Sequence, residues 1–148
     1  MNEPEIEIVL NQNGVWLLNG EEITHARTCR AFSQNIFQTE GGFEIRIGPE
    51  KKAIQVEDTL YFVTGISGDQ NEGFTLNLND GREVNLDPHT LLYKPGRLTC
   101  RVLHPNNGMI VEAKFLTSAY YQLLAHLEKN EDGFFIKIKN EKIILDES

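Results

Sequence analysis

The sequence predicts an α+β fold built from two tandem copies of one unit, each a helix combined with antiparallel sheet. The first observation is a repeat, because the segment GFEIRI at residues 42–47 recurs as GFFIKI at residues 133–138. Position 43 matches position 134, so the offset, 134 minus 43, is 91 residues. The second observation is that apolar residues recur at helical spacing just before each copy and alternate at strand spacing within it. Self-similarity at a fixed offset indicates a duplicated structural unit.

The same offset relates other positions on both sides of this segment. The matched pairs are Glu50-Lys51 with Glu141-Lys142, Phe32 with Leu123, and Ile36 with Leu127. An Asn-Gly turn also recurs upstream, with a small shift, at Asn13-Gly14 and Asn107-Gly108. Each copy is therefore expected to run strand, turn, strand, helix, strand, turn, strand. We place the boundary near Asp58, which gives an N-terminal unit at residues 1–58 and a C-terminal unit at residues 59–148.

Each copy contains one predicted helix. In the first, Thr24 is the expected N-cap, because its hydroxyl can accept a hydrogen bond from an otherwise unpaired amide. Four apolar side chains then share one face, at Cys29, Phe32, Ile36 and Phe37. The helix is expected to end at Gly41-Gly42, since glycine adopts the left-handed conformation that closes a helix. The second helix is expected over residues 116–128.

The stretch between the repeats is expected to form antiparallel sheet. Strands are predicted over residues 60–67, 74–78, 83–86 and 98–103. Asp80-Gly81 predicts a hairpin turn in which both central residues have positive φ. Trp16, in a short strand of the first unit, is expected to lie in the core.

The charge balance disfavours binding to nucleic acids or to anionic membranes. The sequence has 14 basic and 22 acidic residues, for a formal net charge of -8, and the basic residues are scattered along it. A negative protein repels phosphate groups unless cations gather locally. A pocket with a few cations is therefore a better expectation than an open basic surface.

The chain carries no pattern for membrane insertion or export. No apolar run reaches the roughly 18 residues needed to cross a bilayer, and the first residues lack the pattern of a secretion signal. The expected location is the cytoplasm. Cys29 and Cys100 are too few for a disulfide framework or a cysteine-based zinc site, so both are expected to be buried thiols.

Residue patterns typical of catalysis or metal binding are absent from the sequence. It has no glycine-rich phosphate loop and no nucleophile elbow. His25 and Cys29 have a helical spacing that suits two metal ligands, but two ligands do not complete a site. His89 and His104 are expected in loops beside prolines, and His126 is expected to face outward from the second helix. We expect no metal and no cofactor.

The densest polar cluster near the unit boundary lies at residues 49–58. It can be interpreted as a ligand pocket, in which lysines bind an anion and carboxylates accept hydrogen bonds. It can also be interpreted as a solvated hairpin turn followed by a charged strand end, because charged turns usually face water. Glu57 and Asp58 are neighbours on a strand and point to opposite faces, which argues against an acid and base acting on one substrate.

Short motifs in both units are similar to those of a known family. They are Trp16, Gly20, Phe32, Pro49-Glu50-Lys51, Val56-Glu57-Asp58, Val111-Glu112-Ala113-Lys114 and Tyr121-Gln122-Leu123. Together they resemble the bacterial domain-of-unknown-function family 1285, with Lys114 where an arginine is more typical. The resemblance implies a domain duplication, a second half of pleckstrin-homology-like form, and a site between the halves for a nucleotide-type ligand in signalling. Carried over to this sequence, it places Glu50, Lys51, Glu57 and Asp58 near that site.

Our leading hypothesis is a non-enzymatic module that binds a small anionic, nucleotide-type ligand in the cleft between its units. Lysines would offset the ligand's charge, arginines would assist from the first helix, and carboxylates would fix its orientation. The candidate ligand-binding residues are Arg27, Arg30, Glu50, Lys51, Lys52, Glu57 and Asp58.

Two other functions stay open. One is a protein–protein interaction scaffold or homodimer that uses an exposed sheet edge or an apolar patch around Tyr61, Phe62 and Tyr93. The other is a hydrolase or transferase in which Glu57 and Asp58 act as acid and base.

Overall fold

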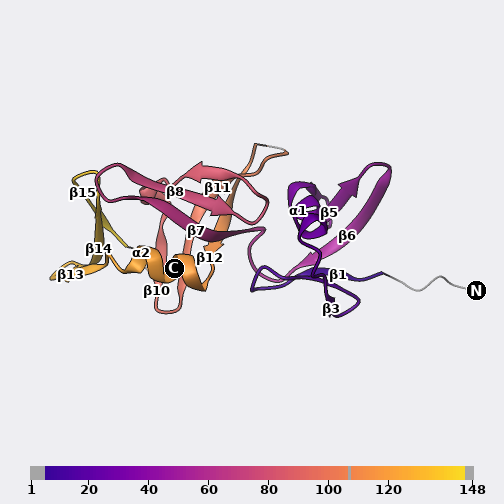
Figure 1. Cartoon of the computed structure of the whole chain (residues 1–148), viewed down its shortest axis with the longest axis horizontal. Helices are drawn as coiled ribbons and strands as arrows, with labels where there is room; N and C mark the ends of the chain where they lie inside the picture. The colour runs from indigo at the N-terminus through magenta and orange to yellow at the C-terminus, as the bar shows by residue number, and fades with distance from the viewer. Residues whose placement is uncertain (1–5, 107, 146–148) are drawn as a thin grey trace, which may run out of the picture.

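The first half of the chain forms a six-stranded sheet with one helix beside it (Figure 1). The structure is a computed structural model that describes residues 6–106 and 108–145. The strands are β1 (Ile8–Leu10), β2 (Trp16–Leu18), β3 (Glu21–Glu22), β4 (Ile36–Thr39), β5 (Gly42–Ile47) and β6 (Glu50–Val56), and the helix is α1 (Ala26–Gln34). Their order in the sheet is β3-β2-β1-β6-β5-β4. We refer to the described residues up to 58 as the first unit and to those from 59 as the second unit.

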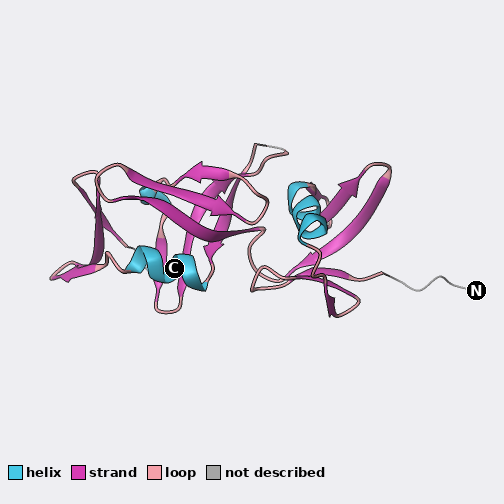
Figure 2. Cartoon of the chain, viewed as in Figure 1, coloured by secondary structure: helices cyan, strands magenta, loops and turns pink. Residues whose placement is uncertain are grey.

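The second half forms another six-stranded sheet, a helix and a small three-stranded sheet (Figure 2). Its large sheet contains β7 (Tyr61–Asp69), β8 (Gly73–Leu78), β9 (Glu83–Asn85), β10 (Leu92–Lys94), β11 (Arg97–Leu103) and β12 (Ile110–Phe115), in the order β10-β11-β12-β7-β8-β9. A 3-10 helix, η1 (Pro88–Thr90), follows β9. After α2 (Thr117–Leu124) come β13 (Glu128–Asn130), β14 (Gly133–Ile138) and β15 (Glu141–Ile144), which form the three-stranded sheet.

Each large sheet is mixed, because it contains one parallel pair among antiparallel ones. In the first, β1 lies parallel to β6, with Val9 beside Gln55. In the second, β7 lies parallel to β12, with Tyr61 beside Ala113. The α+β class predicted from the sequence is confirmed, but the prediction of purely antiparallel sheets is wrong. A parallel pair joins strands that are distant in the sequence and therefore leaves no local turn signal.

The sequence repeat is visible in the order and position of the elements. An offset of 91 residues carries the start of α1 at Ala26 to the start of α2 at Thr117, and it carries β5 onto β14 without a gap. It also carries Glu50, the first residue of β6, to Glu141, the first residue of β15. The copies differ in tertiary arrangement, since β6 pairs with β1 and β5, whereas β15 pairs with β14 alone among the described strands. Asn107, in the second Asn-Gly turn, lies outside the described residues.

Both helices are shorter than predicted. α1 stops at Gln34, and Ile36 and Phe37 continue as β4, where Ile36 pairs with Ile45 of β5. β-Branched and aromatic side chains favour a strand once a partner strand is available. α2 stops at Leu124, and Glu128, the last residue of the predicted helix, begins β13. Neither described helix is long and apolar enough to cross a membrane.

The start of α1 is capped by His25, so the prediction of Thr24 as N-cap is wrong. His25 Nδ1 accepts a hydrogen bond from the Thr28 amide at 3.3 Å. Cys29 donates its thiol hydrogen to the Ile23 carbonyl at 3.2 Å. Both side chains thus serve the helix and its packing. Within the described part of the chain, no three or more histidine, cysteine or acidic side chains gather as metal ligands would.

The turn between β8 and β9 lies at the predicted position but differs from the predicted type. Gly81 has a φ of 92°, whereas Asp80 does not have positive φ. Asp80 is 1% exposed, and its carboxylate accepts hydrogen bonds from the Arg82 amide at 3.0 Å and from Arg82 Nε at 2.7 Å. The buried carboxylate of Asp80 and the half-buried guanidinium of Arg82 therefore pair across the turn and stabilise it.

One hydrophobic cluster extends through both units. Trp16 is buried in it, as predicted. Tyr61, Phe62 and Tyr93 are buried as well, so the prediction of an apolar surface patch around them is wrong. β7 lies between β12 and β8 inside the second sheet, which covers its first residues. Cys100 is also in the cluster, where burial raises the pKa of its thiol to about 12.

His126 does not face outward as predicted. It is half-buried, and its ring lies 5.6 Å from the ring of Phe74, centre to centre. The helix that was expected to present it ends two residues earlier, at Leu124. The shorter helix changes the direction of the side chain.

Candidate functional site

The two units meet where the end of α1 contacts the β8–β9 turn. Gln34 Nε2 donates a hydrogen bond to the Asp80 carbonyl at 2.9 Å. On the same segment of the first unit, the Ile36 carbonyl accepts a hydrogen bond from Asn106 Nδ2 of the second unit at 2.9 Å. We refer to this contact as the joint.

Ser33 lies at the centre of the joint and is 1% exposed. Its hydroxyl oxygen accepts one hydrogen bond from Trp16 Nε1 at 3.0 Å and another from Asn79 Nδ2 at 3.3 Å. Asn79 Oδ1 accepts a further hydrogen bond, from the Phe62 amide at 3.0 Å. Direct hydrogen bonds therefore fill the joint, and a ligand at the unit boundary has to lie beside it.

A buried polar cluster gathers around Tyr61 in the second unit. The guanidinium of Arg82 lies 5.1 Å from the centre of the Tyr61 ring, and His104 packs edge-on against the same ring at 5.8 Å. The predicted loop position of His104 holds for its backbone only, because its side chain is buried. Burial, assisted by the charge of Arg82, lowers the pKa of His104. The cluster belongs to the protein interior.

Asp58 binds two cations where the chain passes from the first unit to the second. Arg97 donates two hydrogen bonds to its carboxylate, from Nη1 to Oδ2 at 2.7 Å and from Nη2 to Oδ1 at 2.9 Å. Lys114 Nζ lies 3.1 Å from Oδ2. The bonds from Arg97, with those from Lys114, lower the pKa of Asp58 to about 2, against the opposing effect of burial. The carboxylate of Glu112 also acts on Arg97, so the two cations lie near two acidic groups, Asp58 and Glu112.

One residue of this cluster, Lys114, also lines a recess of about 200 Å³ at the unit boundary. Asn13 contributes to it from the β1–β2 turn, and Lys114, Thr117 and Tyr121 contribute from the second unit. We refer to it as the boundary recess. It reaches the start of α2, whose first turn has neither a side-chain cap nor an acidic residue in the described structure. Tyr121 is 67% exposed, so the face of its ring is accessible.

A second hollow, of about 240 Å³, is lined by Asp58 itself, which does not line the boundary recess. Its walls are mostly apolar and include Phe43 of the first unit and Val111 of the second. The charged residues that line it are Asp58 and Glu112, both acidic. An anionic ligand is therefore better accommodated in the boundary recess, where Lys114 is present.

Of the candidate residues predicted from the sequence, only Asp58 belongs to the charged cluster at the unit boundary. Glu57 lies next to it but is exposed, and its Oε1 accepts a hydrogen bond from the Gln12 amide at 3.1 Å. The two carboxylates have different partners, in agreement with the alternation expected on a strand. They do not converge on one point as an acid and base would.

Glu50, Lys51 and Lys52 are exposed at the beginning of β6, and the structure does not bring them to the boundary. Lys51 lies opposite Arg46 in the β5–β6 hairpin, which points away from the second unit (Figure 1). The distance has a simple cause, because β6 is seven residues long and a strand rises about 3.3 Å per residue. The strand therefore separates its first residues from Asp58 by about 20 Å.

Arg27 and Arg30 are exposed on α1 and do not line the boundary recess. Arg30 instead lies against the β8–β9 turn, where its Cδ is 3.4 Å from the position of a Cβ on Gly81. The cations that sequence reasoning did not place at the boundary are Arg97 and Lys114. Only Lys114 left a signal, because it belongs to a motif of the family resemblance.

Comparison with solved structures shows how the chain relates to known folds. A crystal structure of a DUF1285 family protein from Silicibacter pomeroyi DSS-3 matches with a TM-score of 0.63 and 18% sequence identity, over 99% of this chain and 84% of that one. The chain has the fold of a DUF1285 family protein. A second, from Shewanella baltica OS155, matches with a TM-score of 0.60 and 16% identity, over 81% of this chain and 91% of that one.

These matches confirm the family resemblance at the level of the fold. No protein-family model matches the sequence, and no curated protein matches it. Identities below one fifth do not carry the identity of a ligand from one protein to another, so the function has to be argued from the site.

Proposed function

We propose that this protein binds a small phosphorylated, nucleotide-type ligand in the boundary recess and does not catalyse its conversion. The observation that carries the proposal is Lys114, a cation that lines the recess and whose partner carboxylate, Asp58, is already bound by Arg97. In a protein with an overall charge of -8, a recess whose one charged lining residue among those described is a lysine favours an anionic ligand.

Lys114 is the residue that binds the phosphate in this proposal. Each carboxylate oxygen of Asp58 accepts a hydrogen bond from Arg97. Asp58 therefore remains paired when Lys114 turns toward a ligand. The first turn of α2 supports the same role. Its amides lack a side-chain cap, and the positive end of a helix dipole stabilises an anion.

Tyr121 is the proposed platform for a base. Its exposed ring stands edge-on to Tyr120, at 5.1 Å and 90°, which holds it in place. Stacking of a base on an aromatic side chain contributes on the order of 1–3 kcal/mol. The recess of about 200 Å³ accommodates a phosphate and part of a sugar, while the base lies over Tyr121 outside it.

The same geometry disfavours the alternative of a hydrolase. A general acid or base needs a carboxyl group whose pKa lies near the working pH. The pKa of Asp58 is lowered to about 2 by its cations, and Glu57 faces Gln12 instead of the recess. The pleckstrin-homology-like form of the second unit and a regulatory role in the cytoplasm of a bacterium are parts of the same proposal.

Calorimetric titration with nucleotides, cyclic dinucleotides and phosphorylated metabolites tests the proposal. We expect at least one phosphorylated compound to bind, Lys114→Ala to weaken it at least tenfold, and Tyr121→Ala to weaken the nucleotide but not inorganic phosphate. Lys51→Ala is the control, because Lys51 is an exposed lysine of the first unit away from the recess. Equal losses in Lys51→Ala and Lys114→Ala, or no binding by any compound, would overturn the proposal.

A second candidate function is an interaction scaffold, which one surface feature favours. Leu103 and Ile110 lie opposite each other at the end of the β11–β12 hairpin and are 51% and 62% exposed. Paired exposed apolar residues are typical of a contact with another protein. Mass measurement over a range of concentrations, with Leu103→Lys as the variant, distinguishes this function from the first.

A further inference from the structure

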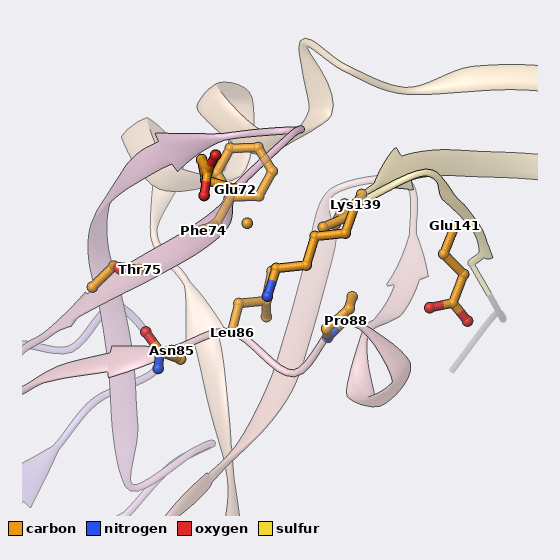
Figure 3. Close-up of a pocket in the computed structure, with 10 residues that line it drawn as sticks. Glu72, Phe74, Thr75, Asn85, Leu86, Pro88, Lys139 and Glu141 are labelled. Atoms are coloured by element: carbon orange, nitrogen blue, oxygen red, sulfur yellow. The ribbon is translucent and has the colours of Figure 1, made fainter.

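A separate recess of about 250 Å³ lies in the second unit (Figure 3). Three parts of the chain that are far apart in the sequence form its walls: β8, the segment that joins β9 to η1, and the β14–β15 turn. The residues that matter here are Glu72, Phe74, Leu86, Ile138, Lys139 and Glu141. We refer to it as the hairpin recess.

Lys139 has an unusual backbone conformation at the rim of this recess. Its φ is 53°, in the left-handed region that side chains with a Cβ rarely adopt. The offset of 91 residues maps Lys139 onto Gly48, whose φ is 56°. The two copies of the hairpin thus share a positive φ at this position, with glycine in one and lysine in the other. The backbone alone favours glycine, so the lysine side chain is present for another reason.

Tertiary contacts hold Lys139 in place. Its amide donates a hydrogen bond to the Gln70 carbonyl at 2.6 Å, and Gln70 Nε2 donates to the Lys137 carbonyl at 2.8 Å. The side chain runs along the backbone of Gly73, since a Cβ on Gly73 would lie 2.9 Å from Lys139 Cε. The amino group reaches across the recess toward Leu86 (Figure 3). Among the described residues, none accepts a hydrogen bond from it.

Two carboxylates line the same recess as Lys139. Glu141 pairs with His89, its Oε1 lying 3.2 Å from Nε2 of the histidine. Glu72 has no ion-pair partner within the described residues. One ammonium group and one carboxylate thus share a recess without binding each other.

The charges decide which class of ligand fits. A simple anion bound to Lys139 would lie near the carboxylate of Glu72, and a simple cation bound to Glu72 would lie near the ammonium group of Lys139. A zwitterion places a group of opposite sign beside each. The floor is apolar, because Phe74, Leu86 and Ile138 are buried hydrophobic residues, and it suits a small side chain. The volume of about 250 Å³ is below that of pockets for drug-sized ligands and matches a small molecule.

We propose that the hairpin recess binds a small zwitterion of the α-amino-acid class. The ligand carboxylate binds Lys139 Nζ, the ligand ammonium binds the Glu72 carboxylate, and the ligand side chain packs against Phe74 and Leu86. This site shares no residue with the boundary recess, so either can exist without the other.

Titration of the full chain with the free amino acids, followed by nuclear magnetic resonance, tests the proposal. For any amino acid that binds, the N-acetyl derivative removes the positive charge and the methyl ester removes the negative one. We expect each derivative to bind at least about tenfold more weakly, since each loses one charge-assisted hydrogen bond. Equal binding of the N-acetyl derivative would mean an anion site, equal binding of the ester would mean a cation site, and either result would overturn the proposal. So would the failure of every amino acid to bind.

Substitutions of single residues test whether the amino acid binds in the hairpin recess. Lys139→Gly restores the residue that the first copy has at this position, so it is expected to keep the fold while it abolishes binding. Glu72→Gln removes the other charge and keeps the shape of the side chain. Lys137→Ala is the matched control, since Lys137 is exposed on the same hairpin but does not line the recess. Binding that survives Lys139→Gly, or that Lys137→Ala weakens equally, contradicts the site.

Discussion

The ion pairs of Asp58 at the unit boundary make the stability of the protein depend on pH. Its pKa in the folded protein is about 2, below the ordinary value of 3.8. A lowered carboxyl pKa contributes stability that is complete above the unfolded value and is lost as the pH falls through the folded value. The difference corresponds to about 2 kcal/mol. Urea unfolding of the wild type and Asp58→Asn should therefore differ by about that amount at pH 6 and converge between pH 4 and pH 2. A difference that stays constant down to pH 2 would contradict this assignment.

Gly14 of the first unit lies so close to Phe62 of the second that an added methyl group would contact the ring. Its φ is 79°, and a Cβ there would lie 3.1 Å from Cγ of Phe62. Gly20 is a matched control, because its φ is 84° and a Cβ there meets nothing within 4 Å. Both alanine variants should lose about 1 kcal/mol to the backbone, and Gly14→Ala should lose clearly more. Equal midpoints of thermal unfolding for the two variants would contradict this prediction, because they would mean that the Phe62 ring moves aside with no loss of stability.

The joint is the element-level contact on which the two units depend, and Ser33 is its centre. Ser33→Ala leaves Trp16 Nε1 and Asn79 Nδ2 without their acceptor in a buried place. We expect a loss of about 2 kcal/mol and a change in tryptophan emission, since Trp16 is the single tryptophan. Ser118→Ala, at an exposed position of α2, is the control and should change stability by less than about 0.5 kcal/mol. Similar losses of stability in Ser33→Ala and Ser118→Ala would contradict the central role of Ser33 in the joint.

Elements with a local signal could be predicted from the sequence, and elements decided by a distant partner could not. The repeat, both helix starts to within two residues, and the position of the β8–β9 turn all follow from short patterns. Ile36 and Phe37 fit a helical face equally well in the sequence, and only β5 makes them a strand. The parallel pairs of β1 with β6 and of β7 with β12 depend on the whole sheet in the same way.

The candidate site shows the same limit. Asp58 could be placed at the boundary because the repeat locates the boundary in the sequence. Arg97 and Lys114 could not, since they reach Asp58 from strands 39 and 56 residues away. Lys51 and Lys52 are close to Asp58 in the sequence, but an extended strand carries them far from it in space.

At the scale of the whole molecule, a shared core predicts that both units unfold together. The hydrophobic cluster includes Trp16 of the first unit and Tyr61 of the second. The sequence supplies a reporter for each unit, because the single tryptophan is in the first and all 4 tyrosines are in the second. Tryptophan emission and tyrosine absorbance should therefore show the same midpoint in urea. Separate midpoints would mean that the joint is weaker than either unit.

The parallel pairs have a consequence for the order of events during synthesis. β1 has to wait for β6, and β7 has to wait for β12, before either sheet is complete. A chain that leaves the ribosome from its N-terminus makes β6 available well before β12, and domains generally fold as units in that order. The strands of the first sheet can thus pair while the second unit is still being made, so α1 with Ser33 and Gln34 forms before the shared core is completed. It then acts as a template on which the β8–β9 turn docks, so the slow closure of the second sheet starts from an anchored turn instead of a free chain.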